Sequence, residues 1–174
     1  MKRDLFLLGS TGSIGDTTLK IVKKHKSIFR VKLLSTNQNI NKIYKQSLEF
    51  KVTRIVIFDK DKYYKNKQKF DKKKIKVFFS IKEALKDYKG KSFLTVNAIS
   101  GIDGLEPSLD TIKYSKNLAI ANKESIICGW NLISNKLKKY NTKFIPIDSE
   151  HFSIWKLIEN DDKTNIQKIV LTAS

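Results

Sequence analysis

The chain has 174 residues, a length that suits one domain with its own hydrophobic core. Apolar residues make up 40% and charged residues 30%, which indicates a globular protein and excludes a wholly disordered one. No apolar run approaches the ~20 residues that span a bilayer, and the run near the N-terminus is too short for a signal peptide. The single cysteine, Cys128, excludes an internal disulfide, which suits a reducing compartment, and we expect a cytoplasmic protein. We expect Cys128 itself to be a small buried residue.

The net charge of +18 arises from 35 Lys and Arg against 17 Asp and Glu. Such an excess can mark a nucleic-acid-binding protein. Lysines are scattered along nearly every segment, however, and the densest cluster, residues 60–76, is typical of a solvated helix and loop. We keep nucleic-acid binding as an alternative but do not expect it to be the primary role.

Short apolar runs alternate with helical patterns along the chain. Strands are expected at residues 5–8, 30–34, 54–58, 76–79, 93–99, 118–121, 143–147 and 168–172. Apolar residues recur at helical spacing between them. Two of these stripes are Ile14, Thr18, Ile21 and Val22, and Ile126, Trp130, Ile133 and Leu137. Trp130 belongs to the second stripe, and Trp155 to a third with Ile154 and Ile158, so both tryptophans are expected in the core.

Repeated alternation of strand and helix predicts an α/β fold, a Rossmann-like doubly wound and mainly parallel sheet. Strands that are apolar throughout, such as residues 55–58, fit burial on both faces of the sheet. The same alternation continues past residue 145, where acidic residues appear and a shift in role is expected.

Glycines follow the first expected strand in the spacing G-x-x-G-x-x-G, at Gly9, Gly12 and Gly15. A glycine-rich turn between a strand and a helix is typical of dinucleotide sites, where backbone amides at the helix start bind the diphosphate. We expect the N–H groups of Gly12, Ser13 and Ile14 to be free for this purpose. The alternative is an ordinary glycine turn with Ser13 as the helix N-cap.

The end of the second expected strand bears on the choice between NAD and NADP. NAD sites usually carry an acid there, which binds the ribose 2′-hydroxyl. No acid occurs from Ser35 to Lys42, where the residues are neutral or basic. The absence of a carboxylate removes repulsion of a 2′-phosphate, so we expect NADP.

Two carboxylates, Asp148 and Glu150, flank Ser149 directly after the strand that ends near Pro146. Strand ends of an open α/β sheet border the ligand crevice, and Mg²⁺ or Mn²⁺ prefers oxygen ligands. The pair therefore indicates a divalent-metal site. The alternative is a helix N-cap formed by Asp148 or Ser149, with Glu150 in the first turn. His151 either orients a ligand or is a partly buried helix residue.

Four motifs occur in order: GSTGSIG at 9–15, NAISGIDGL at 97–105, ANKES at 121–125 and PIDSEH at 146–151. Together they resemble the 1-deoxy-D-xylulose 5-phosphate reductoisomerases over all 174 residues. The resemblance implies an enzyme that uses NADPH and Mg²⁺ or Mn²⁺ to form 2-C-methyl-D-erythritol 4-phosphate in non-mevalonate isoprenoid biosynthesis. It also implies a small phosphorylated sugar as substrate and a homodimer at full length.

Matching the family residue by residue implies roles for thirteen positions. Catalytic residues would be Lys123, Asp148 and Glu150, of which Asp148 and Glu150 would bind the metal. Lys123, Ser149 and Glu150 would bind substrate. The cofactor residues would be Thr11, Gly12, Ser13, Ile14, Asn37, Gln38, Asn39, Asn122 and Glu124. Relatives often have a lysine in the segment that is Asn37-Gln38-Asn39 here, which predicts a weaker grip on the 2′-phosphate.

The resemblance also predicts the domain organisation. Residues 1–147 would form an NADPH-binding domain and residues 148–174 the beginning of a catalytic metal and substrate domain. The family's third metal carboxylate and its flexible flap would lie beyond Ser174. We therefore expect a truncated chain that is incomplete for turnover, and the alternative function is an inactive NADPH-binding fragment.

Overall fold

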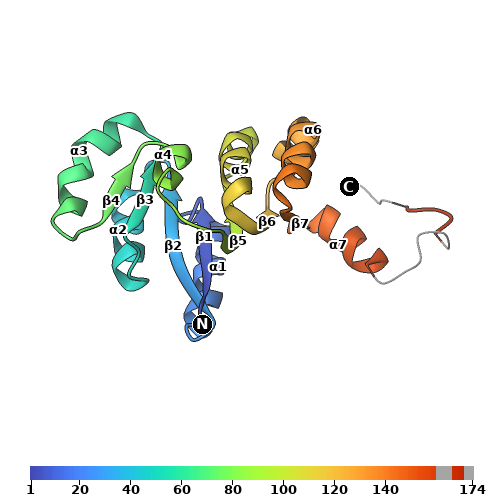
Figure 1. Cartoon of the computed structure of the whole chain (residues 1–174), viewed down its shortest axis with the longest axis horizontal. Helices are drawn as coiled ribbons and strands as arrows, with labels where there is room; N and C mark the ends of the chain where they lie inside the picture. Colours follow the sequence, from blue (N-terminus) through green and yellow to red (C-terminus); the bar gives the residue numbers. More distant parts are fainter. Residues whose placement is uncertain (160–165, 171–174) are drawn as a thin grey trace.

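The computed structural model describes residues 1–159 and 166–170. Within these ranges, seven parallel strands form one sheet in the order β4-β3-β2-β1-β5-β6-β7 (Figure 1). The strands are β1 (Arg3–Leu8), β2 (Phe29–Thr36), β3 (Arg54–Ile57), β4 (Lys76–Phe78), β5 (Ser92–Asn97), β6 (Ser115–Ile120) and β7 (Lys143–Pro146). The α/β, Rossmann-like class predicted from the sequence is confirmed.

The helices follow the strands in alternation. They are α1 (Ser13–Lys24), α2 (Ile40–Glu49), α3 (Lys60–Asp71), α4 (Ile81–Leu85), α5 (Leu105–Thr111), α6 (Lys123–Tyr140) and α7 (Ser149–Ile158), with short 3₁₀ turns at Ile102–Gly104 and Ile112–Tyr114. Among the described residues, no helix combines the length and the apolar character needed to cross a membrane.

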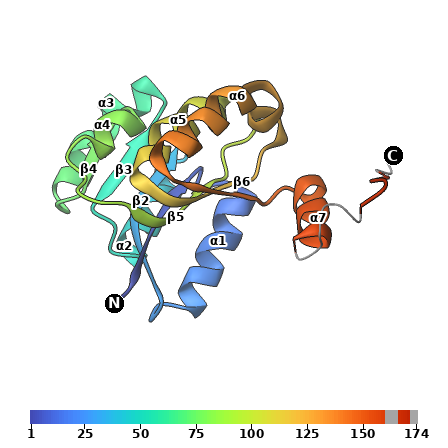
Figure 2. The same ribbon diagram turned by 45° about the vertical axis from the view of Figure 1, so that its right-hand side comes forward.

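Two layers of helices cover the sheet. Leu5 and Leu7 of β1 face a cluster that includes Leu19 of α1 and Ile43 of α2. The alternate residues of β1 belong to a cluster on the other side, with residues of α4. Figure 2 shows α1 on one face of the sheet and α5 and α6 on the other. The sheet is therefore buried on both faces, which explains why its strands are apolar throughout.

The eighth expected strand, at residues 168–172, is wrong for residues 168–170, which have no regular structure. Residues 171 and 172 lie outside the described ranges. Ile169 is 50% and Val170 72% exposed. An apolar run becomes a strand only where a neighbouring strand supplies hydrogen bonds, which spacing along the sequence cannot reveal.

Several expected core positions are also wrong. Ile14 and Ile21 are exposed, because the face of α1 that meets the sheet is Gly15, Leu19 and Val22. Trp130 is 43% exposed and packs edge-to-face on Phe144, while Gly129 takes the buried place beside it. Cys128 is exposed on α6. Trp155 is only half-buried, since α7 has no buried residue and lies beyond β7 at the end of the sheet.

The order of the strands fixes where a ligand can bind. The chain moves outward from β1 through β2, β3 and β4, then returns to place β5 beside β1. Open α/β sheets bind ligands outside the carboxyl ends of their strands at such a reversal. The glycine loop follows β1, residues 98–101 follow β5, Asn122 follows β6 and Asp148 follows β7. All of these segments therefore meet at one edge of the sheet.

Candidate functional site: a cleft at the carboxyl edge of the sheet

The loop from Gly9 to Gly12 brings β1 very close to α1. Gly9 has φ +72°, and a Cβ there would lie 2.6 Å from the carbonyl oxygen of Ala98. A Cβ on Gly15 would lie 2.5 Å from the carbonyl oxygen of Gly9. The first and third glycines are therefore required by close backbone packing, and α1 begins directly against the end of β1.

The start of α1 offers donors to an anion. Its N-cap is Gly12, which has no side chain to cap the helix, so the alternative of Ser13 as N-cap is wrong. The expectation of a free Gly12 N–H is also wrong, because it donates to the Gly9 carbonyl at 3.2 Å. Within the described residues, the N–H groups of Ser13, Ile14 and Gly15 have no hydrogen-bond acceptor. These amides and the positive end of the helix dipole suit a phosphate group.

The residues after β2 separate into two places. Asn37 lines a pocket of about 530 Å³ together with Phe58 and Ile99. Gln38 and Asn39 line a neighbouring pocket of about 430 Å³ with Lys62. Both side chains are also engaged: Gln38 Nε2 donates to Asp59 Oδ2 at 3.1 Å, and Asn39 caps α2 by accepting from the N–H of Lys42.

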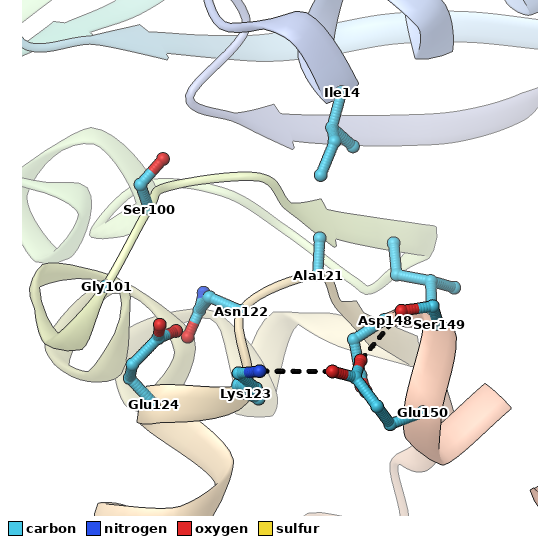
Figure 3. A pocket seen from close by; sticks show the side chains of 11 residues that line it. Ile14, Ser100, Gly101, Ala121, Asn122, Lys123, Glu124, Asp148, Ser149 and Glu150 are labelled. Carbon is cyan, nitrogen blue, oxygen red and sulfur yellow. Dashed lines mark hydrogen bonds and ion pairs between the residues drawn. The ribbon is translucent and has the colours of Figure 1, made fainter. Parts of the chain in front are cut away.

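A third pocket, of about 390 Å³, joins the start of α1 to the acidic pair (Figure 3). Its lining residues are Ile14, Ser100, Gly101, Ala121, Asn122, Lys123, Glu124, Ile147, Asp148, Ser149 and Glu150. We call this pocket the edge cleft. Seven of its residues were predicted as site residues. Ser100 and Gly101 were not, although the φ of +67° at Gly101, in a G-rich motif, marks a tight loop after β5.

Asn122 lies in the edge cleft, but its side-chain oxygen and nitrogen are both hydrogen-bonded to other residues of the chain. It is 5% exposed, its Oδ1 accepts from the N–H of Ser125 at 3.1 Å, and its Nδ2 donates to the Ile99 carbonyl at 2.8 Å. It therefore caps α6 and fastens the loop after β5 to the start of that helix.

Asn122→Ala is expected to lower the free energy of unfolding by about 2 kcal/mol, because it removes the cap and leaves a buried carbonyl unpaired. Asn122→Ser keeps a capping oxygen and places no charge against the Ile99 carbonyl, so it serves as the matched control and should cost less. Urea denaturation followed by circular dichroism measures both. Equal stability of Asn122→Ala and the unsubstituted chain would contradict the capping role.

Asp148 is buried, and one of its carboxylate oxygens has no hydrogen-bond partner among the described residues. It is 8% exposed, and its Oδ1 accepts from the N–H of His151 at 2.9 Å while lying 2.6 Å from the Nδ1 of the same residue. Its Oδ2 is buried and has no hydrogen-bond partner within the described residues. Asp148 is therefore the N-cap of α7, as the alternative expected, and its Oδ2 takes no part in the cap. His151 is partly buried and holds that carboxylate in place.

Glu150 and Lys123 form an exposed ion pair across the edge cleft. Lys123 Nζ lies 3.0 Å from Glu150 Oε1, and Ser149 Oγ donates to Glu150 Oε2 at 2.7 Å (Figure 3). These two hydrogen bonds, that of Ser149 first, lower the pKa of Glu150 to about 2. The hydrogen bond to Glu150 raises the pKa of Lys123 in turn. The cleft therefore holds a carboxylate and an ammonium that are both charged at neutral pH.

The family model described as 1-deoxy-D-xylulose 5-phosphate reductoisomerase matches residues 5–129 of the chain. The chain belongs to this family. The model of the family's C-terminal domain matches residues 144–174. A reductoisomerase of Pelagibacter ubique is 46% identical over 99% of this chain and 45% of its own length. One of Caldanaerobacter subterraneus is 35% identical over the same shares. The chain thus spans about 45% of the length of these relatives.

Solved reductoisomerase structures have the same fold. The enzyme of Zymomonas mobilis in complex with NADPH superposes with a TM-score of 0.78 at 28% identity, over 87% of this chain and 40% of that one. A reductoisomerase in complex with NADPH, fosmidomycin and magnesium gives 0.80 at 30% identity, over 91% of this chain and 40% of that one.

The edge cleft of this reductoisomerase chain fits a divalent cation in part. The buried, unpartnered Oδ2 of Asp148 is the kind of oxygen that Mg²⁺ binds, and Glu150 supplies a second carboxylate. Glu150 would exchange its bond with Lys123 for the cation. Within the described residues, no group of three or more His, Cys, Asp or Glu side chains could hold a metal. Two protein carboxylates with water and substrate oxygens still suit Mg²⁺, which is seldom fully enclosed by protein.

Proposed function

We propose that the chain carries the nucleotide site and part of the metal site of an NADPH- and divalent-metal-dependent reductoisomerase. The reaction would convert 1-deoxy-D-xylulose 5-phosphate to 2-C-methyl-D-erythritol 4-phosphate in non-mevalonate isoprenoid biosynthesis. The single observation that carries this proposal is the edge cleft, where Ile14 at the start of α1 and the pair Asp148 and Glu150 line the same space. A dinucleotide bound by the glycine loop would extend toward the acids.

The glycine loop would hold the diphosphate of NADPH. The amides of Ser13 and Ile14 and the hydroxyl of Ser13 are the donors that favour this role, and Gly12 leaves room for the phosphates. Thr11 would lie beside them, with its hydroxyl shared with Thr36 at 2.8 Å. Asn37, Gln38 and Asn39 would lie along the adenosine end, where the lack of an acid favours NADPH over NADH. Asn122 and Glu124 would border the nicotinamide end of the cofactor.

At the other end of the edge cleft, Asp148 and Glu150 would hold Mg²⁺ or Mn²⁺ and Lys123 would meet the substrate. A divalent cation supplies charge stabilisation at the oxygens of a sugar substrate. Asp148 is oriented for its task by its contacts with His151, and its Oδ2 remains available. Once Glu150 turns to the cation, the Lys123 ammonium would be released to bind substrate negative charge. The Ser149 hydroxyl would donate its hydrogen bond to a substrate oxygen instead of to Glu150.

Residues 1–174 alone would bind NADPH without turnover. Among the described residues, Asp148 and Glu150 alone would give a weak metal site, which favours NADPH binding over turnover for residues 1–174. We further propose a division between a nucleotide domain, residues 1–147, and the start of a catalytic domain, residues 148–174. In support, β7 ends at Pro146 and α7 begins at Ser149. A cytoplasmic location and a homodimer at full length complete the proposal.

The activity is testable in a chimaera of residues 1–174 with the remaining length of the Pelagibacter ubique relative. It should oxidise NADPH only when 1-deoxy-D-xylulose 5-phosphate and Mg²⁺ are both present. Asp148→Asn should lower kcat/KM about 1,000-fold, because a metal ligand contributes several kcal/mol to transition-state stabilisation.

Asp71→Asn, at the exposed end of α3, is the matched control and should leave kcat/KM unchanged. A folded chimaera that keeps its full activity with Asp148→Asn would remove Asp148 from the site. An equal rate with NADH and with NADPH at the same concentration would contradict the preference for NADPH.

A further inference from the structure

Helix α2 holds two side chains against the glycine loop. Gln46, 7% exposed, donates from Nε2 to the Ser10 carbonyl at 2.9 Å, and its Oε1 accepts from Ser10 Oγ at 2.8 Å. Lys42 donates from Nζ to the Thr11 carbonyl at 2.9 Å. Two consecutive carbonyls of the loop are thus bound by side chains that lie more than 30 residues later in the chain.

The same two side chains bind Asp16 in the first turn of α1. Gln46 Nε2 donates to Asp16 Oδ1 at 3.2 Å, and the Lys42 ammonium pairs with Asp16 Oδ2. Lys42, Gln46 and Asp16 together are called the α2 clamp below. An unpaired carboxylate at this position would repel an anion at the start of α1, and Lys42 neutralises it.

The bound carbonyls fix the direction of the loop amides. A trans peptide is planar, so its N–H points opposite to its C=O, and no cis peptide occurs among the described residues. Because the Ser10 carbonyl points to Gln46, the N–H of Thr11 points away from α2. The Thr11 carbonyl points to Lys42, so the Gly12 N–H turns away from α2 and reaches the Gly9 carbonyl. These contacts hold the loop in a tight turn directly before the N–H groups of Ser13, Ile14 and Gly15 at the start of α1.

We propose that the α2 clamp positions the glycine loop for a dinucleotide diphosphate and cancels the charge of Asp16 beside it. Lys42 and Gln46 are positioning residues that act through the loop backbone and through Asp16. This inference rests on the proposed function, because it assumes that the loop binds the diphosphate of NADPH. It also gives Lys42 a role at the diphosphate.

The test measures two dissociation constants for the 174-residue chain. NADPH contains the diphosphate, whereas adenosine 2′-monophosphate has the adenosine end and lacks it. Lys42→Met and Gln46→Met should each weaken NADPH binding about tenfold, and should change binding of adenosine 2′-monophosphate less than about twofold. Lys45→Met removes the same charge from an exposed position of α2 and should leave both constants unchanged.

Asp16→Asn in the Lys42→Met background should restore much of the NADPH affinity, because it removes the uncompensated charge. The inference is overturned if Lys42→Met binds NADPH as tightly as Lys45→Met does. It is also overturned if Lys42→Met loses affinity for NADPH and for adenosine 2′-monophosphate by the same factor, because that would indicate general destabilisation. Lys42 is half-exposed, so its substitution is expected to leave the fold intact. Failure of the unsubstituted chain to bind NADPH would overturn the proposed function itself.

Discussion

Gly12→Asp is expected to weaken NADPH binding about 100-fold, or ~2.7 kcal/mol, while the fold stays intact. Gly12 has φ −80°, and a Cβ there would meet only the Gly9 carbonyl oxygen, at an ordinary 3.6 Å. The side chain therefore fits without strain. Its carboxylate would stand at the uncapped start of α1, where the cofactor diphosphate is expected, and the two anions would repel each other.

Gly12→Asn is the matched control because asparagine has nearly the same shape without the charge. It should weaken NADPH binding much less than Gly12→Asp does. Isothermal titration calorimetry gives both dissociation constants, and raising the salt concentration should narrow the difference between them. If both variants bind NADPH as tightly as the unsubstituted chain does, the diphosphate does not lie at the start of α1.

Gly15→Ala is expected to destabilise the fold by about 3 kcal/mol, which lowers Tm by about 6–12 °C. A Cβ at Gly15 would lie 2.5 Å from the Gly9 carbonyl oxygen and 2.6 Å from two backbone atoms of Ser10. Backbone cannot move aside as a flexible side chain can, so α1 must shift away from β1. NADPH binding should be lost as well, because the loop geometry depends on this contact.

Gly12→Ala provides the comparison within the same loop, since its Cβ has room, and it should change Tm by less than about 2 °C. Differential scanning calorimetry measures both variants. If Gly15→Ala melts at the temperature of the unsubstituted chain, α1 does not pack against the loop as closely as the structure shows.

The sequence predicts the fold well because the sheet is buried on both faces. Each of the first seven expected strands is an apolar run of the length that a buried parallel strand needs, such as residues 54–58 for β3. The eighth run has the same composition but lacks a neighbouring strand in the described residues 166–170. Helix faces were harder to predict, because Gly15 and Gly129 occupy buried places that hydrophobic periodicity assigns to Ile14 and Trp130.

The site is predicted in outline only. Its location follows from the motifs, since parallel strands end at the same edge and so bring Ile14 and Asp148 to one cleft. What the sequence cannot show is which polar atoms are already engaged. Asn122 Nδ2 is bound to the Ile99 carbonyl, and Lys42 Nζ is bound to Asp16 and to the Thr11 carbonyl, through contacts between residues 23 to 31 positions apart. Such pairings arise from packing of distant elements and leave no local pattern.

The most direct test of a shared cleft is paramagnetic broadening by Mn²⁺ in the NMR spectrum of the 174-residue chain with NADPH bound. We predict that a small amount of Mn²⁺ broadens the amide signals of residues 121–124 and 148–151 together with the nicotinamide ring protons, and that Asp148→Asn abolishes this broadening. If these amides stay sharp, or if broadening is the same with Asp148→Asn, the metal does not bind beside the nucleotide.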